Sequence, residues 1–250
     1  MKHFVAAVSF LTRLPAGRWV AVSTEDVGKS SRWFPLIGVL LGAVYVLAWR
    51  ALSIIFPATI VALFIVVIEA LLTGALHLDG LADMADGFGG GRTREDVLRI
   101  MRDHTIGAYG AISLILVVGL KVVSIVALSE RQRVTAYLLI APVLSRWSTV
   151  ILNNALPYAR RSVSEGAPAS GSVNAFVGRT ELAVATVTAL LISSAVIQWS
   201  VIPCSVVVLG VSAVTGFVCW RRIGGVTGDT LGANTECCEV AVLLVGLAMR

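Results

Sequence analysis

Charged residues are scarce in this sequence. Asp, Glu, Lys and Arg make up 14% of its 250 residues, whereas an average soluble domain contains about 25%. No long polar stretch interrupts the chain, which excludes a large soluble domain. Cysteine is also rare. The four cysteines have no regular spacing and two lie in apolar runs, which excludes a disulfide framework.

Long apolar runs recur along the whole chain instead. A backbone in lipid must satisfy its own hydrogen bonds, as a helix does. The sequence therefore predicts an all-α, polytopic integral membrane helical bundle that forms a single domain over residues 1–250. About seven transmembrane helices are expected, at Trp33–Phe56, Ala58–Leu76, Ile106–Leu128, Val134–Leu156, Leu182–Trp199, Val201–Trp220 and Ala233–Met249.

The positions of the basic residues predict the orientation of these helices. If the N-terminus is cytoplasmic, 14 of the 20 Lys and Arg residues flank the cytoplasmic ends of the spans, and four lie on the other side. Basic residues favour the cytoplasmic side, so the N-terminus is predicted to be cytoplasmic and the C-terminus outside. This distribution accounts for the net charge of +5 without a nucleic-acid partner.

Three acids follow the second apolar run, in the stretch "HLDGLADMADGFGGGRT". On a helix of about 100° per residue, Asp79, Asp83 and Asp86 share one face. Like charges on one face repel each other, so they favour a bound cation, and oxygen ligands favour Mg²⁺. The spacing predicts a magnesium site that holds a diphosphate; the alternative is a solvated acidic helix end.

The residues after these acids are candidates for phosphate binding. Gly89 and Gly90 could offer backbone N–H groups to a phosphate, or form a plain turn. The next helix is predicted to be amphipathic and to lie at the membrane interface. Its Arg99 and Arg102 are suited either to phosphates or to lipid headgroups, and Asp103 follows them.

A second unusual stretch, "GGVTGDTLGANTECCE", lies at the start of the last span. Asp229, Glu236 and Glu239 fall within an arc of about 80° if this stretch is helical. Acids inside a span are candidates for function. The alternative is an ion pair with a basic residue such as Arg146.

Lys121 and Arg146 are the cations inside the predicted spans, and Arg160 lies on the predicted cytoplasmic side. Each is suited to pair with an acid or to contact a phosphate. Ordinary snorkelling or structural pairing is the alternative for Lys121 and Arg146, and for Arg160 an ordinary position on the positive cytoplasmic side.

Five segments together resemble the cobalamin synthase family, whose full name is adenosylcobinamide-GDP ribazoletransferase. In chain order they are "FLTRLP", "FPLIGVLLG", "TGALHLDGLADMADGFGG", "IMRDHTIGAYG" and "GGVTGDTLGANTE". They extend from the N-terminus to the last span. The aspartate segment is the most specific of them.

The resemblance implies an Mg²⁺-dependent enzyme of the cell inner membrane that joins adenosylcobinamide-GDP to α-ribazole, or its 5′-phosphate, and releases GMP. It implies active-site motifs at residues 73–110 and 221–239 on the cytoplasmic face. The family's signature acids fall on Asp79, Asp83 and Asp86, and its C-terminal motif falls on Thr227, Gly228, Asp229 and Glu236. The sequence "DHT" at residues 103–105 and the pair Cys237–Cys238 depart from the usual family pattern.

These residues suggest a mechanism in which Mg²⁺ and cations hold the diphosphate while a carboxylate acts as general base. Asp86 and Asp229 are the candidates for the base. Glu236 is a candidate fourth metal ligand, and Arg102, Lys121 and Arg146 are candidates to stabilise the charge of the leaving GMP. The number of metal ions and any homo-oligomer are left open.

Two other functions are less consistent with the sequence. A CDP-alcohol phosphatidyltransferase would need an Arg where Asp83 stands, and a second acidic motif that is missing. A cation transporter would need acids near the middle of the membrane, where Glu69 is the one candidate.

Overall fold

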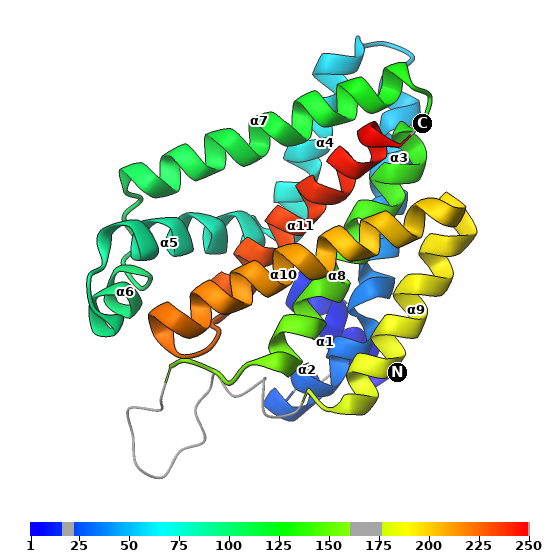
Figure 1. Cartoon of the computed structure of the whole chain (residues 1–250). Helices are drawn as coiled ribbons and strands as arrows, with labels where there is room; N and C mark the ends of the chain where they lie inside the picture. Colours follow the sequence, from blue (N-terminus) through cyan, green and yellow to red (C-terminus); the bar gives the residue numbers. More distant parts are fainter. Residues whose placement is uncertain (17–22, 161–176, 250) are drawn as a thin grey trace.

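The computed structural model describes residues 1–16, 23–160 and 177–249. Within these residues the regular structure is helical, and the pairing of Tyr158 with Val226 is an isolated bridge. The predicted all-α bundle is therefore confirmed (Figure 1). The helices are α1 (Lys2–Leu11), α2 (Thr24–Ser30), α3 (Phe34–Leu52), α4 (Ala58–Thr73), α5 (Leu76–Gly90), α6 (Arg94–Ile100), α7 (Ala108–Glu130), α8 (Val134–Ala155), α9 (Arg179–Ile197), α10 (Val201–Ile223) and α11 (Gly228–Ala248).

Helix α8 is the most extensively buried helix, and α3, α9, α10 and α11 pack against it (Figure 1). Helix α3 approaches it through two glycines. A Cβ atom at Gly38 would lie 2.5 Å from the carbonyl oxygen of Pro142, and one at Gly42 would lie 2.6 Å from that of Leu139. Small residues four positions apart allow helices in a membrane to pack this closely.

The helices long and apolar enough to cross a membrane number five in the described part of the chain, or six if one bent pair counts as a span. The predicted spans 182–199 and 201–220 belong to one continuous stretch, Arg179–Ile223. It contains α9, a short 3₁₀ turn at Gln198–Ser200 and α10. The helices meet at this turn and run back at an angle to each other (Figure 1). A helix occupies each of the seven predicted ranges, and the two ranges within this stretch are the separate helices α9 and α10.

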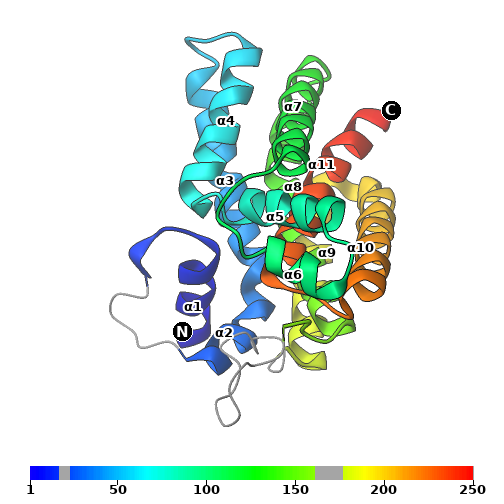
Figure 2. The same cartoon turned by 90° about the vertical axis from the view of Figure 1, so that its left-hand side faces the viewer.

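Helices α4 and α5 form the bent pair, with an angle of 91° between them. The bend occurs at Gly74 and Ala75, whose φ angles are 64° and 57°. Glycine adopts positive φ without a steric penalty, and it ends α4 in a left-handed conformation. The aspartate stretch therefore lies on a separate helix, which runs nearly at right angles to α4. Helices α5 and α6 lie side by side at this end of the molecule (Figure 2).

Candidate functional site at the α5–α11 crossing

The predicted helix that carries the aspartates is confirmed as α5. Asp79 is exposed and Asp83, one turn later, is partly buried. Their carboxylates accept no hydrogen bond from the described residues, so they are available to a ligand. His77 is buried on another side of the helix, as expected for a residue outside the acidic face.

The start of α11 lies against α5 beside these two carboxylates. A Cβ atom at Gly80 would lie 2.7 Å from the backbone oxygen of Asp229, so a larger residue would push the two helices apart. Thr227 caps α11, because its hydroxyl accepts a hydrogen bond from the backbone N–H of Thr230. The first turn of a long helix thus begins beside Asp79 and Asp83, where its N–H groups favour negative charge.

The segment 157–160 adds a cation to this crossing. Its backbone pairs with Val226, whose N–H donates to the carbonyl of Pro157 (2.9 Å). A Cβ atom at Gly225 would clash with the same carbonyl. Arg160 at the end of the segment donates a hydrogen bond to the Asp229 carboxylate (2.6 Å). The structure therefore brings Asp79, Asp83, Asp229 and Arg160 together, from the two predicted motifs and the 157–160 segment.

Asp86 has a different environment from the other two aspartates. Its carboxylate accepts hydrogen bonds from the backbone N–H groups of Gly107 (2.7 Å) and Gly110 (2.8 Å). These groups belong to the start of α7, which has no side-chain cap at Gly107 itself. Asp86 therefore caps α7 from another helix, and the metal site proposed below leaves it out.

The expected glycine loop is the last turn of α5. Gly89 and Gly90 are helical, so this turn offers no ring of N–H groups to a phosphate. Arg222 closes the end of the helix by donating to the carbonyls of Phe88 (2.8 Å) and Gly91 (2.7 Å). The loop interpretation is wrong, because the helix continues through the glycines and an arginine caps its C-terminus.

Helix α6 follows and is capped by Thr93, whose hydroxyl accepts a hydrogen bond from the backbone N–H of Asp96. Arg99 is exposed on α6 and forms an ion pair with Asp96 (3.6 Å), and Arg102 is exposed in the turn after the helix. Asp103 accepts hydrogen bonds from the side chain and backbone of Thr105, which hold the pKa of its carboxyl below the ordinary value. The contacts of Asp103 are therefore local to its own loop.

Lys121, Arg146 and Glu236 lie in a separate buried cluster with Glu69 and Glu239. The Lys121 ammonium is 2.7 Å from a carboxylate oxygen of Glu69, 2.8 Å from Glu236 and 3.2 Å from Glu239. Arg146 pairs with Glu239 and lies 3.8 Å from Glu69. Structural pairing, the alternative interpretation, is therefore found for both Lys121 and Arg146. Glu236 is not placed with the aspartates, and its partner is Lys121.

The donor set at the crossing fits a magnesium ion that is shared with a substrate. No three side chains of Asp, Glu, His or Cys lie close enough to hold a metal by themselves, among residues 1–16, 23–160 and 177–249. Mg²⁺ is commonly bound by one or two carboxylates together with phosphate oxygens and waters. Asp79 and Asp83 supply such a pair.

Fold and site together define a polytopic helical membrane protein with a carboxylate–arginine site at one end of its bundle. The family model of cobalamin-5-phosphate synthase matches residues 3–247, so the chain belongs to this family. This result confirms the resemblance read from the motifs.

Curated relatives agree over almost the full length. The chain is 40% identical to the adenosylcobinamide-GDP ribazoletransferase of Chlorobaculum parvum, over 98% of this chain and 94% of that protein. It is 38% identical to the protein of the same name from Syntrophobacter fumaroxidans, over 99% and 98%. No solved structure matches the chain.

Proposed function

We propose that this protein is an adenosylcobinamide-GDP ribazoletransferase of the cell inner membrane, with its site on the cytoplasmic face. It transfers the adenosylcobinamide phosphate to α-ribazole or its 5′-phosphate and releases GMP. We assign the reaction to the α5–α11 crossing because Asp79 and Asp83 lie there beside the Asp229–Arg160 pair, at the first turn of α11. Family membership supports the reaction.

Asp79 and Asp83 would hold Mg²⁺ together with the diphosphate of the GDP group. The metal would supply charge neutralisation and orientation for an in-line displacement. Arg160 lies at the same crossing, and its planar guanidinium is suited to donate two parallel hydrogen bonds to the oxygens of a phosphate. The start of α11 is exposed at Gly228 and leaves room for the phosphate, since a Cβ atom at Gly228 would meet nothing within 4 Å.

Asp229 is the better placed candidate for the general base. One of its carboxylate oxygens accepts from Arg160, and Arg160 thereby fixes the orientation of the carboxylate. In the proposed step, the ribose 3′-hydroxyl of the acceptor attacks the phosphorus nearer the cobinamide, and its proton passes to Asp229. Both oxygens of Asp86, the other candidate, are engaged by α7.

The test uses membrane vesicles that contain the protein, adenosylcobinamide-GDP and α-ribazole 5′-phosphate, with and without Mg²⁺. Formation of GMP and of the corrinoid product is measured. We expect Mg²⁺-dependent formation of both. In Asp79→Asn and Asp83→Asn we expect turnover to fall by roughly 10²- to 10³-fold, because several kcal/mol of charge stabilisation are lost.

The matched control is Glu130→Gln, which removes an exposed carboxylate at the far end of α7. It should keep full turnover and the same Mg²⁺ requirement. Full Mg²⁺-dependent turnover in Asp79→Asn would contradict the metal assignment. Absence of product from the folded wild type would contradict the reaction, and CDP-alcohols would then be the next substrates.

A further inference from the structure

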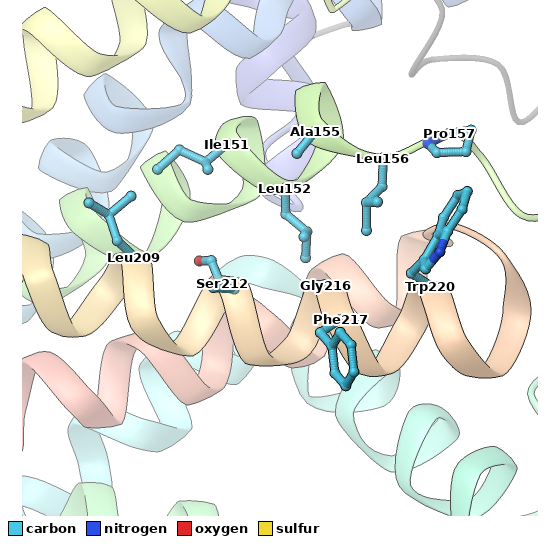
Figure 3. A pocket seen from close by; sticks show the side chains of 11 residues that line it. Ile151, Leu152, Ala155, Leu156, Pro157, Leu209, Ser212, Gly216, Phe217 and Trp220 are labelled. Atoms are coloured by element: carbon cyan, nitrogen blue, oxygen red, sulfur yellow. The ribbon is translucent and has the colours of Figure 1, made fainter.

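A large apolar groove lies between the C-terminal half of α8 and the outer face of α10 (Figure 3). Its volume is about 860 Å³. Residues of α8 and α10 line it, among them Ile151, Leu156, Leu209, Ala213, Phe217 and Trp220. The one hydroxyl in the lining, that of Ser212, bonds inward to Asn234 of α11. The groove therefore presents an almost purely apolar surface.

The groove is separate from the aspartate site. Cys219, Ile223 and Val226 are completely buried, and Leu152 packs with them in one apolar cluster at this end of the bundle. Pro157 of the 157–160 segment lines the groove, but Asp79, Asp83, Asp229 and Arg160 do not. Its occupant is therefore a molecule that arrives from the membrane side and has an apolar body.

The outer wall of the groove is exposed on α10, within a stretch apolar enough to cross a membrane, so it faces lipid. Phe217 is 63% exposed and Trp220 is 53% exposed. Trp220 stands in the last turn of α10, and tryptophan is enriched where a membrane helix reaches the headgroups. The groove thus runs from the hydrocarbon region to the headgroup level.

A cation stands at the headgroup end. Arg221 is exposed, and its guanidinium lies 5.8 Å from the centre of the Phe217 ring that lines the groove. Its neighbour Arg222 is already engaged with the end of α5. An apolar groove that ends at an arginine matches a phospholipid, because basic residues at the membrane surface attract anionic headgroups.

We propose that this groove binds an acyl chain of an anionic phospholipid whose phosphate contacts Arg221. This binding would depend on the shape of the groove and the charge of Arg221, and it is independent of the catalytic reaction. Lipid bound here fills the gap between α8 and α10 and covers Phe217 and Trp220.

The test is native mass spectrometry of the full-length protein in detergent, titrated with phosphatidylglycerol or phosphatidylcholine. We expect the wild type to retain one phosphatidylglycerol with about fivefold higher affinity than phosphatidylcholine, the ratio that one basic contact provides. Arg221→Gln should abolish this preference. Ala213→Phe, at an exposed lining position, should reduce the binding of both lipids.

Two matched variants serve as controls and should bind both lipids as the wild type does. Arg179→Gln removes an exposed arginine at the start of α9, and Val206→Phe enlarges an exposed residue of α10 outside the groove. Equal affinity of the wild type for the two lipids would overturn the proposal. So would undiminished lipid binding in Ala213→Phe, or a dimer that Ala213→Phe disrupts, since a second copy would then occupy the groove.

Discussion

At the residue scale, Asp83 and Asp86 lie three positions apart on α5 but have different partners. Asp83 faces the crossing with α11, whereas Asp86 accepts two backbone hydrogen bonds from the start of α7. We predict that Asp86→Ala lowers the free energy of unfolding by about 1–2 kcal/mol, the usual effect of losing a helix cap. Asp79→Ala, which loses no hydrogen bond, should unfold like the wild type.

Denaturant titration of the detergent-solubilised variants measures this difference. Turnover at low temperature, where both variants are folded, gives the complementary result: Asp86→Ala should retain most of its activity and Asp79→Ala should not. An inactive Asp86→Ala with normal stability would return Asp86 to the catalytic or metal-binding role that its position in the motif suggests.

Sequence reasoning identified the site acids because their spacing on α5 is local. The 3.6-residue period is enough to place Asp79 and Asp83 on one face. It cannot show that a backbone N–H 21 residues later engages Asp86. It also could not pair Lys121 with Glu236, which lie on different helices, because a single sequence shows which charges are buried but not which of them meet.

At the element scale, the buried charges join four helices. Glu69 of α4, Lys121 of α7, Arg146 of α8 and two glutamates of α11 lie within one cluster of ion pairs. Breaking a buried pair by removing one partner leaves an uncompensated charge and costs about 3–5 kcal/mol. We predict a loss of this size in the free energy of unfolding for Lys121→Met.

The double variant Lys121→Met/Glu236→Gln should recover a large part of this loss, because Glu236 makes its ion pair with Lys121. Unfolding midpoints of the wild type, the two single variants and the double variant form the cycle that measures the coupling. Additive losses would show that these two charges do not stabilise each other across α7 and α11.

Element boundaries followed from the sequence wherever the apolar runs end in clear signals. The helices α7 and α8 lie close to their predicted ranges, with a turn of polar residues between them. The predicted span 58–76 ends three residues after the last residue of α4, Thr73, but neither the bend between α4 and α5 nor its 91° angle was predicted. Hydropathy reports that a segment is apolar, whereas the angle depends on the left-handed conformations of Gly74 and Ala75.

At the scale of the whole molecule, the charged ends of the bundle differ. Basic residues of α6, of the 157–160 segment and of the end of α10 lie at the end of the bundle that carries the aspartate site, whereas the far end of α7, at Glu130, is followed by a turn with two basic residues, Arg131 and Arg133 (Figure 1). Basic residues favour the cytoplasmic side. The aspartate site is therefore expected to face the cytoplasm.

This expectation is measured by placing single cysteines at two exposed glutamates, Glu95→Cys on α6 and Glu130→Cys on α7. A membrane-impermeant maleimide added to intact cells should label Glu130→Cys alone, and permeabilised cells should label both. The native chain is the blank, since three of its four cysteines are buried. Labelling of Glu95→Cys in intact cells would invert the orientation and put the aspartate site outside, contrary to the proposed cytoplasmic face. The packing of the bundle would then override the positive-inside distribution of charge, and the proposed cytoplasmic position of Asp79 and Asp83 would be wrong.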